Sequence, residues 1–194
     1  MTSITRLCGV DEAGRGPWAG PVTAGAVILD QNRPIPGLND SKKLSDTKRL
    51  KLESAIKTQA FAWGIGWVTA AEIDQINIRE ATFLAMHRAI DALGCLPDEI
   101  VIDGNSLPAS LPAPARALIG GDAIEPAISA ASILAKTARD RLMVELCEEY
   151  PGYGFAKHKG YGTQQHADAL ARLGPSEIHR QSFAPVAKAR LEIG

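Results

Sequence analysis

The chain has 194 residues, of which 45% are hydrophobic and 22% are charged. This size and composition predict a single domain over residues 1–194, since chains of roughly 100–200 residues bury one core. No apolar run approaches the roughly 20 residues that cross a bilayer, and Met1 to Arg6 lack a signal-peptide pattern, so we expect a cytoplasmic protein. The formal net charge of −1 excludes a general attraction to polyanions, so nucleic acid would have to be bound by local basic patches and metal.

Short apolar runs alternate with helical patterns along the chain. Strands are predicted at Leu7–Val10, Val22–Leu29, Phe61–Val68, Glu99–Ile102 and Ala115–Ile119. Helices are predicted at about 45–59, 70–93, 128–149 and 164–173, the first with Ser45 as its N-cap. Three strands followed by strands that alternate with helices predict an α/β fold. Its mixed central sheet should have antiparallel opening strands and flanking helices.

Three predicted strands run into an acidic residue beside a small one, at Asp11-Glu12-Ala13, Asp103-Gly104 and Asp122-Ala123. Each aspartate alone could be a turn or helix cap, because Asp bonds readily to nearby backbone donors. Three together favour a cluster, and clustered carboxylates repel one another unless cations neutralise them. Since no Cys/His grouping favours a softer metal, the pattern predicts a site for Mg²⁺ or Mn²⁺.

Asp11 and Glu12 are neighbours, and adjacent side chains of a regular strand point to opposite faces. Both can therefore face the same metals only if the chain bends there, or if one of them contributes a backbone oxygen. Gly14 and Gly16 favour such a bend.

The segment Gly14 to Ala19 superficially matches a dinucleotide-binding fingerprint. That fingerprint must open a helix, whereas Gly20-Pro21 interrupts the chain here and a strand is predicted to follow. Two interpretations remain. Gly14, Arg15 and Gly16 form either a tight turn between strands, or a loop of little bulk that lies against a sugar while Arg15 donates to a phosphate or ribose.

Several motifs, taken together and in order, resemble those of the type 2 ribonucleases H, specifically the ribonuclease HII family. They span nearly the whole chain: Gly9 to Pro17, Ala19 to Val22, Asp40 to Leu44, Ile102 to Gly104, Gly121 to Ala123, Ile128 to Ile133, Ala135-Lys136, Arg139-Asp140, His158 to Thr163, His179-Arg180 and Ser182-Phe183. Two positions depart from the family pattern. Trp18 stands where leucine is common, and Gly120 stands where lysine is frequent.

The resemblance implies a ribonuclease H-like fold with a helical C-terminal segment. It also implies that Asp11, Glu12, Asp103 and Asp122 are the four acidic active-site residues, and that they bind two metal ions, Mg²⁺ or Mn²⁺. An enzyme of this family would hydrolyse the RNA strand of RNA/DNA hybrids and incise duplex DNA at embedded ribonucleotides. The products would carry 5′-phosphate and 3′-hydroxyl ends.

The resemblance further assigns substrate contacts. Gly14, Arg15 and Gly16 are similar to the loop that senses the ribose 2′-hydroxyl, and Tyr161 is similar to the aromatic residue that stacks on the neighbouring sugar. Without the resemblance, Tyr161 would be read as an ordinary core or loop aromatic. The expected phosphate contacts are Lys42, Lys43, Lys159, His179 and Arg180. For the lysines, a solvated surface is the alternative.

Two other functions remain open at this stage. One is a DNA nuclease of the resolvase or transposase type on the same fold, against which the ribose-sensing loop argues. The other is a non-catalytic module that binds hybrids, which the intact acidic set makes less attractive. We expect a monomer whose partners are RNA/DNA hybrids and DNA containing ribonucleotides, with no membrane partner.

Overall fold

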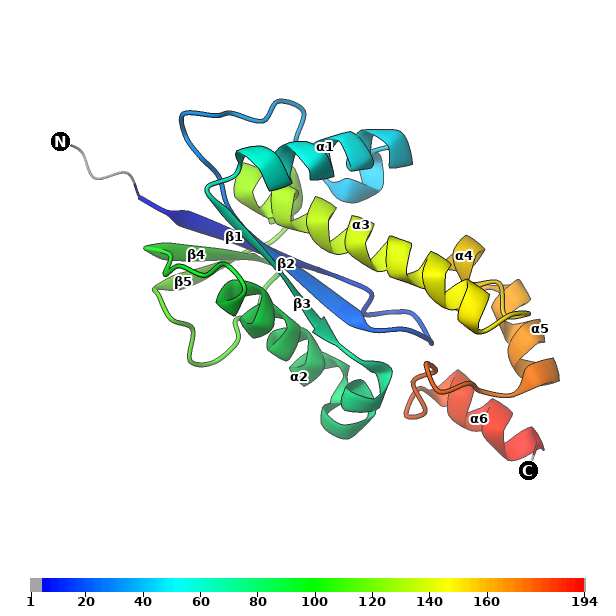
Figure 1. Cartoon of the computed structure of the whole chain (residues 1–194). Coiled ribbons are helices and arrows are strands. Elements are labelled where there is room, and N and C mark those ends of the chain that lie inside the picture. The colour runs from blue at the N-terminus through cyan, green and yellow to red at the C-terminus, as the bar shows by residue number, and fades with distance from the viewer. Residues whose placement is uncertain (1–4, 194) are drawn as a thin grey trace.

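A five-stranded sheet forms the centre of the computed structural model, which describes residues 5–193 (Figure 1). The strands are β1 (Leu7–Ala13), β2 (Val22–Ile28), β3 (Ala62–Val68), β4 (Glu99–Asp103) and β5 (Ala115–Leu118). Their order across the sheet is β3-β2-β1-β4-β5. The strand β2 pairs antiparallel with β1 and β3, whereas β1, β4 and β5 run parallel. The predicted mixed sheet with antiparallel opening strands is therefore confirmed.

Helices cover both faces of the sheet and continue beyond one end of it. The helices are α1 (Asp46–Gln59), α2 (Ala70–Asp91), α3 (Pro126–Glu149), α4 (Phe155–His158), α5 (Gln164–Leu173) and α6 (Ala184–Ile193), with 3₁₀ turns η1 (Ser41–Lys43) and η2 (Gly121–Ala123). Figure 1 shows α1 and α3 on one side of the sheet and α2 on the other. The last three helices form the expected C-terminal helical segment. Within residues 5–193, no helix is both long and apolar enough to span a membrane.

Two strand glycines let helices approach the sheet closely. A Cβ atom built on Gly9 of β1 would lie 2.1 Å from the carbonyl carbon of Ala127 in α3. One built on Gly66 of β3 would lie 2.0 Å from the carbonyl oxygen of Ala85 in α2. No real side chain tolerates such distances, so glycine at these positions allows α3 and α2 to pack directly on the backbone of the sheet. This contact brings α3 beside the end of β1.

The first helix begins as the sequence predicts. The side chain of Ser45 accepts a hydrogen bond from the backbone N–H of Lys48, the usual arrangement of an N-cap. The first strand, in contrast, is longer than predicted. Asp11, Glu12 and Ala13 continue the ladder with β2 rather than beginning a turn. The two acidic residues therefore lie in regular strand, without the bend that would turn both side chains toward the same metals.

The helix predicted over residues 70–93 is interrupted. Asn77 has a φ of 67° inside α2, a left-handed conformation that ends one helical stretch and begins another. Its side-chain oxygen accepts hydrogen bonds from the backbone N–H groups of Arg79 and Glu80, at 3.0 and 3.2 Å. Asn77 thus caps the second stretch.

Candidate functional site

Three aspartates from distant parts of the chain converge. Asp11 lies in β1, Asp103 ends β4, and Asp122 lies in the turn η2 that follows β5. One carboxylate oxygen from each lies within 4.8 Å of the others. The parallel pairing of β1, β4 and β5 produces this convergence, because the carboxyl ends of parallel neighbours meet at one edge of a sheet. The expected cluster of these three residues is therefore present.

Asp11 occupies the most buried position of the cluster, with 6% of its surface exposed. Burial, followed by the negative charge of Glu12, raises the pKa of Asp11 well above its ordinary value of 3.8. Hydrogen bonds from Ser132 and from the backbone N–H of Glu12 (2.7 Å) oppose that shift. A cation bound here would offset the cost of burying the negative charge.

The turn η2 carries Asp122 and also contacts Asp103. The backbone N–H of Gly121 donates to Asp103 Oδ1 at 2.7 Å, which fixes that carboxylate against η2. Burial raises the pKa of Asp122, with further contributions from the charges of Asp103 and Asp40. Lys42 acts in the opposite direction, so the positive charge of η1 lies near this side of the cluster.

Glu12 is placed differently from the three aspartates. It belongs to the same strand as Asp11 but is outside the group whose oxygens lie within 4.8 Å of one another. Its carboxylate shares a cavity of about 260 Å³ with Asp103, Arg15 and Arg79. Burial raises the pKa of Glu12, the charge of Arg15 lowers it, and the charge of Asp103 raises it. Glu12 is therefore near the cluster, on the side of Asp103.

Two buried arginines hold the loop between β1 and β2. Arg180 donates to the backbone carbonyl oxygens of Gly14, Arg15 (2.7 Å) and Gly20 (3.0 Å). Arg139 of α3 donates to those of Pro21 (2.9 Å), Ala19 (3.1 Å) and Lys159 (3.0 Å). Carbonyl groups thus satisfy both guanidinium groups, and the loop is fixed in one shape.

Arg15 belongs to this loop, and Tyr161, from the segment between α4 and α5, lies against it. Arg15 is exposed, and its guanidinium lies 3.5 Å from Glu12 Oε1. Tyr161 is 44% exposed, and a Cβ atom built on Gly16 would lie 3.7 Å from its Cε1 atom. The structure therefore brings the Gly14–Gly16 loop and Tyr161 together.

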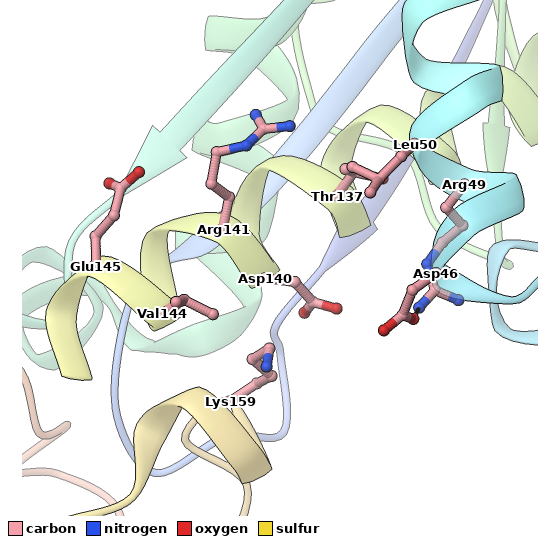
Figure 2. A pocket seen from close by; sticks show the side chains of 9 residues that line it. All are labelled: Asp46, Arg49, Leu50, Thr137, Asp140, Arg141, Val144, Glu145 and Lys159. Atoms are coloured by element: carbon pink, nitrogen blue, oxygen red, sulfur yellow. Dashed lines mark hydrogen bonds and ion pairs between the residues drawn. The ribbon is translucent and has the colours of Figure 1, made fainter. Parts of the chain in front are cut away.

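The expected lysine contacts lie in two places. Lys42 and Lys43 are exposed on η1, and Lys43 Nζ is 3.8 Å from Asp40. Lys159, in contrast, lines a groove of about 390 Å³ between α1 and α3 (Figure 2). None of the clustered aspartates lines that groove. Other cations there have partners in the chain, since Arg49 pairs with Asp46 and Arg141 pairs with Glu53.

The expectation that His179 and Arg180 contact a phosphate does not fit their placement. Their exposed fractions are 1% and 0%, and the donors of Arg180 are already bound to backbone carbonyls. Sequence alone gives no sign of this, because arginine is usually exposed or paired with an acid. The structure instead places both residues behind the loop between β1 and β2.

Ser132 and Arg139 lie in two of the motifs quoted above, but no contact with the candidate site was predicted for either. Ser132 contacts Asp11, and its hydroxyl lies 2.9 Å from that of Ser41. The only available signal was a polar residue on the buried face of an apolar helix, which is weak by itself. Arg139 donates to the carbonyl groups of Pro21 and Ala19, which lie about 120 residues earlier in the sequence.

Comparison with known proteins gives a consistent result. Residues 8–186 match the family described as ribonuclease HII. The ribonuclease HII of Hyphomonas neptunium is 58% identical over 200 residues, covering 96% of this chain and 97% of that protein. The solved ribonuclease H2 of Pyrococcus horikoshii has a TM-score of 0.85 at 27% identity, covering 96% of this chain and 98% of that one. The ribonuclease HII of Archaeoglobus fulgidus, solved with PCNA, has a TM-score of 0.77 at 25% identity, covering 95% and 96%.

The matched region includes the four acidic residues, the glycine loop and Tyr161. The fold agrees as well, because the similarity in structure extends over nearly the whole chain. The chain therefore belongs to the ribonuclease HII family of endoribonucleases, hydrolases that cut the RNA strand of RNA/DNA hybrids.

Proposed function

We propose that Asp11, Asp103 and Asp122, with Glu12 at the side of Asp103, hold two Mg²⁺ or Mn²⁺ ions for phosphodiester hydrolysis. The single observation that carries this proposal is the approach of three carboxylates within 4.8 Å. Carboxylate oxygens are hard ligands, which suit these ions. Such ions supply an activated water and stabilise the leaving 3′-oxygen, so no side chain has to act as the nucleophile.

The residues of the cluster would have separate tasks. Asp11 would give the innermost ligand, because it is the most buried of the three aspartates and is oriented by Ser132. Asp103 would be kept in place by the N–H of Gly121. Glu12 would complete the set from the neighbouring cavity, which it shares with Asp103. The products proposed are a 5′-phosphate and a 3′-hydroxyl.

Selection of RNA is proposed to occur at the loop of Gly14, Arg15 and Gly16. The backbone of this loop is held by Arg180 and is open to an approaching sugar, and Arg15 supplies exposed donors. The 2′-hydroxyl is the group that distinguishes ribose from deoxyribose. The ring of Tyr161 would stack on the next sugar, which would allow incision at a single ribonucleotide in duplex DNA.

Phosphates of the substrate are proposed to contact Lys42, Lys43 and Lys159. The first two are exposed on η1, where the charge of Lys42 acts on Asp122, and their charge is compatible with a strand that crosses the cluster. His179 and Arg180 are proposed to support the loop from behind rather than to contact phosphate. The protein is proposed to act as a monomer. We place that action in the cytoplasm, where a replicating chromosome would provide hybrids.

The direct test uses a DNA duplex that contains one ribonucleotide, with an all-DNA duplex as the matched control. In the presence of Mg²⁺ or Mn²⁺, we expect incision of the first duplex only, with 5′-phosphate ends, and no incision in a chelator. Asp11→Asn and Asp103→Asn should abolish incision while retaining the fold, because each removes a charged ligand. Retained activity in either folded variant would contradict the assigned roles.

A further inference from the structure

Two buried histidines link the Tyr161 loop to the segment that precedes Arg180. The exposed fractions of His166 and His179 are 0% and 1%, and their Nε2 atoms lie 3.1 Å apart. At the far side of His166, Nδ1 lies 3.0 Å from the backbone carbonyl oxygen of Tyr161. At the far side of His179, Nδ1 lies 2.9 Å from the backbone nitrogen of Ser176.

The partners at the two ends determine where the protons lie. A carbonyl oxygen only accepts, so His166 must carry a proton on Nδ1 to bond Tyr161. The backbone N–H of Ser176 only donates, so Nδ1 of His179 must be the acceptor. If both rings are neutral, His179 then carries its proton on Nε2 and donates to the bare Nε2 of His166. Three hydrogen bonds thus run in series from Ser176 through His179 and His166 to Tyr161. We call this series the relay, and all its bonds point in one direction.

The surroundings favour neutral rings. The rings of His158 and His166 are stacked at 4.6 Å, and the rings of Tyr153 and Phe155 lie 5.0 and 5.6 Å from that of His179. Burial lowers the pKa of His179 to about 4, and burial also lowers the pKa of His166. Among the residues described, no carboxylate bonds either ring, whereas the cationic Arg180 directly follows His179.

The same segment also holds the glycine loop. His179 forms a β-bridge with Ala19, and Arg180 donates to the carbonyl oxygens of Gly14 and Arg15. The Trp18 ring lies 5.3 Å from the ring of His166. The dipeptide His179-Arg180 is consequently connected to both proposed recognition elements. It bonds the glycine loop directly, and it is linked to Tyr161 through His166.

We propose that His166 and His179 are positioning residues, which set the Tyr161 ring against the Gly14–Gly16 loop by fixing the carbonyl of Tyr161. This inference rests on the proposed function of Tyr161 in recognising a ribonucleotide. Because both histidines are buried, their proposed role requires no contact with the substrate. Their effect on cleavage passes through the backbone of Tyr161, which a mobile loop would leave poorly aligned.

Kinetic measurements on variants of His166 test the proposal. His166→Phe keeps a ring but removes both nitrogens, whereas His166→Asn keeps a donor near the position of Nδ1. On a DNA duplex with one ribonucleotide, we expect His166→Phe to lower kcat/KM by about fivefold, the usual worth of one hydrogen bond. His166→Asn should recover most of that loss. In a Tyr161→Ala background, His166→Phe should lower kcat/KM by less than about twofold, because the two changes act through one group.

Tyr153→Phe is the matched control. It removes a buried hydrogen bond from the same cluster, that of the Tyr153 hydroxyl to the carbonyl of Gly174 (2.6 Å), without touching Tyr161. It should leave kcat/KM unchanged. Full activity of His166→Phe beside an impaired Tyr161→Ala would overturn the positioning role alone. Full activity of Tyr161→Ala would overturn the proposed recognition by Tyr161, and the positioning role with it.

The proton positions can be tested on the unmodified protein, independently of cleavage and of how the variants fold. Nitrogen-15 NMR of the histidine side chains at pH 7 should show His166 with its proton on Nδ1 and His179 with its proton on Nε2. A proton on Nε2 of His166, or a cationic His179, would break the relay and overturn the inference.

Discussion

At Asp11, burial and the charges of neighbouring carboxylates disfavour the ionised form. The folded-state pKa is raised above its ordinary value of 3.8, so the energetic cost of the carboxylate is absent below that value and grows as pH rises through the folded pKa. The amide of Asn carries no charge. Asp11→Asn is therefore expected to stabilise the metal-free protein at pH 8 and to have a smaller effect at pH 5.

Thermal unfolding in a chelator, at both pH values, measures this difference. Asp140→Asn is a useful comparison, because Asp140 pairs with Lys136 at 2.7 Å on α3. This variant should be less stable than the wild type. A destabilised Asp11→Asn at pH 8 would show that repulsion within the cluster does not dominate its energetics.

His179 is expected to change the stability of the fold with pH in the opposite direction. Its folded-state pKa is lowered from 6.5 to about 4, mainly by burial, so its contribution is complete above pH 6.5 and is lost as pH falls toward 4. Between pH 7 and pH 5, that loss should be on the order of 2 kcal/mol. His166, whose pKa burial also lowers, should add to it.

Urea unfolding of the wild type and of His179→Gln at the two pH values isolates the contribution of His179. The variant is expected to be less stable at pH 7 but to lose less stability on acidification. Identical losses in the two proteins would mean that His179 takes up no proton on unfolding in this range.

At the residue scale, the placement of the acidic site residues was easier to predict from the sequence than the placement of the basic residues. Asp11, Asp103 and Asp122 follow apolar runs, and strand ends are where side chains from distant segments meet. The guanidinium of Arg180 was expected at the surface. Its real partners are carbonyl groups more than 150 residues earlier, and no pattern near Arg180 encodes them.

Among the elements, the loop between β1 and β2 depends most on contacts from elsewhere. Lysine cannot reproduce the three separate carbonyl contacts of Arg180, because its donors share one nitrogen. Arg180→Lys should therefore cost about 2–3 kcal/mol of stability, since it leaves buried carbonyls unsatisfied. Denaturant unfolding measures the loss, with Arg190→Lys on the exposed face of α6 as the control. Equal stability of the two variants would contradict the support assigned to Arg180.

Element boundaries were predictable where a local cap defines them, as at Ser45. They were not predictable where tertiary pairing decides. The first strand was predicted to end at Val10, yet pairing with β2 extends it through Asp11 to Ala13. Asn77 is similar, because the apolar pattern of α2 continues through the break and only the backbone conformation reveals it.

For the whole molecule, the order of apolar runs was sufficient to predict a mixed sheet with antiparallel opening strands. It could not predict how β1 and β4 align, although that register brings Asp11 and Asp103 to one edge. Nor could it predict that Glu12 lies outside the aspartate group, because the alternation of a strand matters only once the chain is known not to bend.

The most direct test of the account is a titration of Mn²⁺ into the wild type, Asp103→Asn and Asp140→Asn, with free ion followed by electron paramagnetic resonance. We predict that Asp103→Asn weakens Mn²⁺ binding by about tenfold or more, because mutating even a residue that only supports a metal ligand lowers metal affinity by that much. Asp140→Asn should bind like the wild type. Equal Mn²⁺ binding by all three proteins would contradict a metal site at the converging ends of β1 and β4.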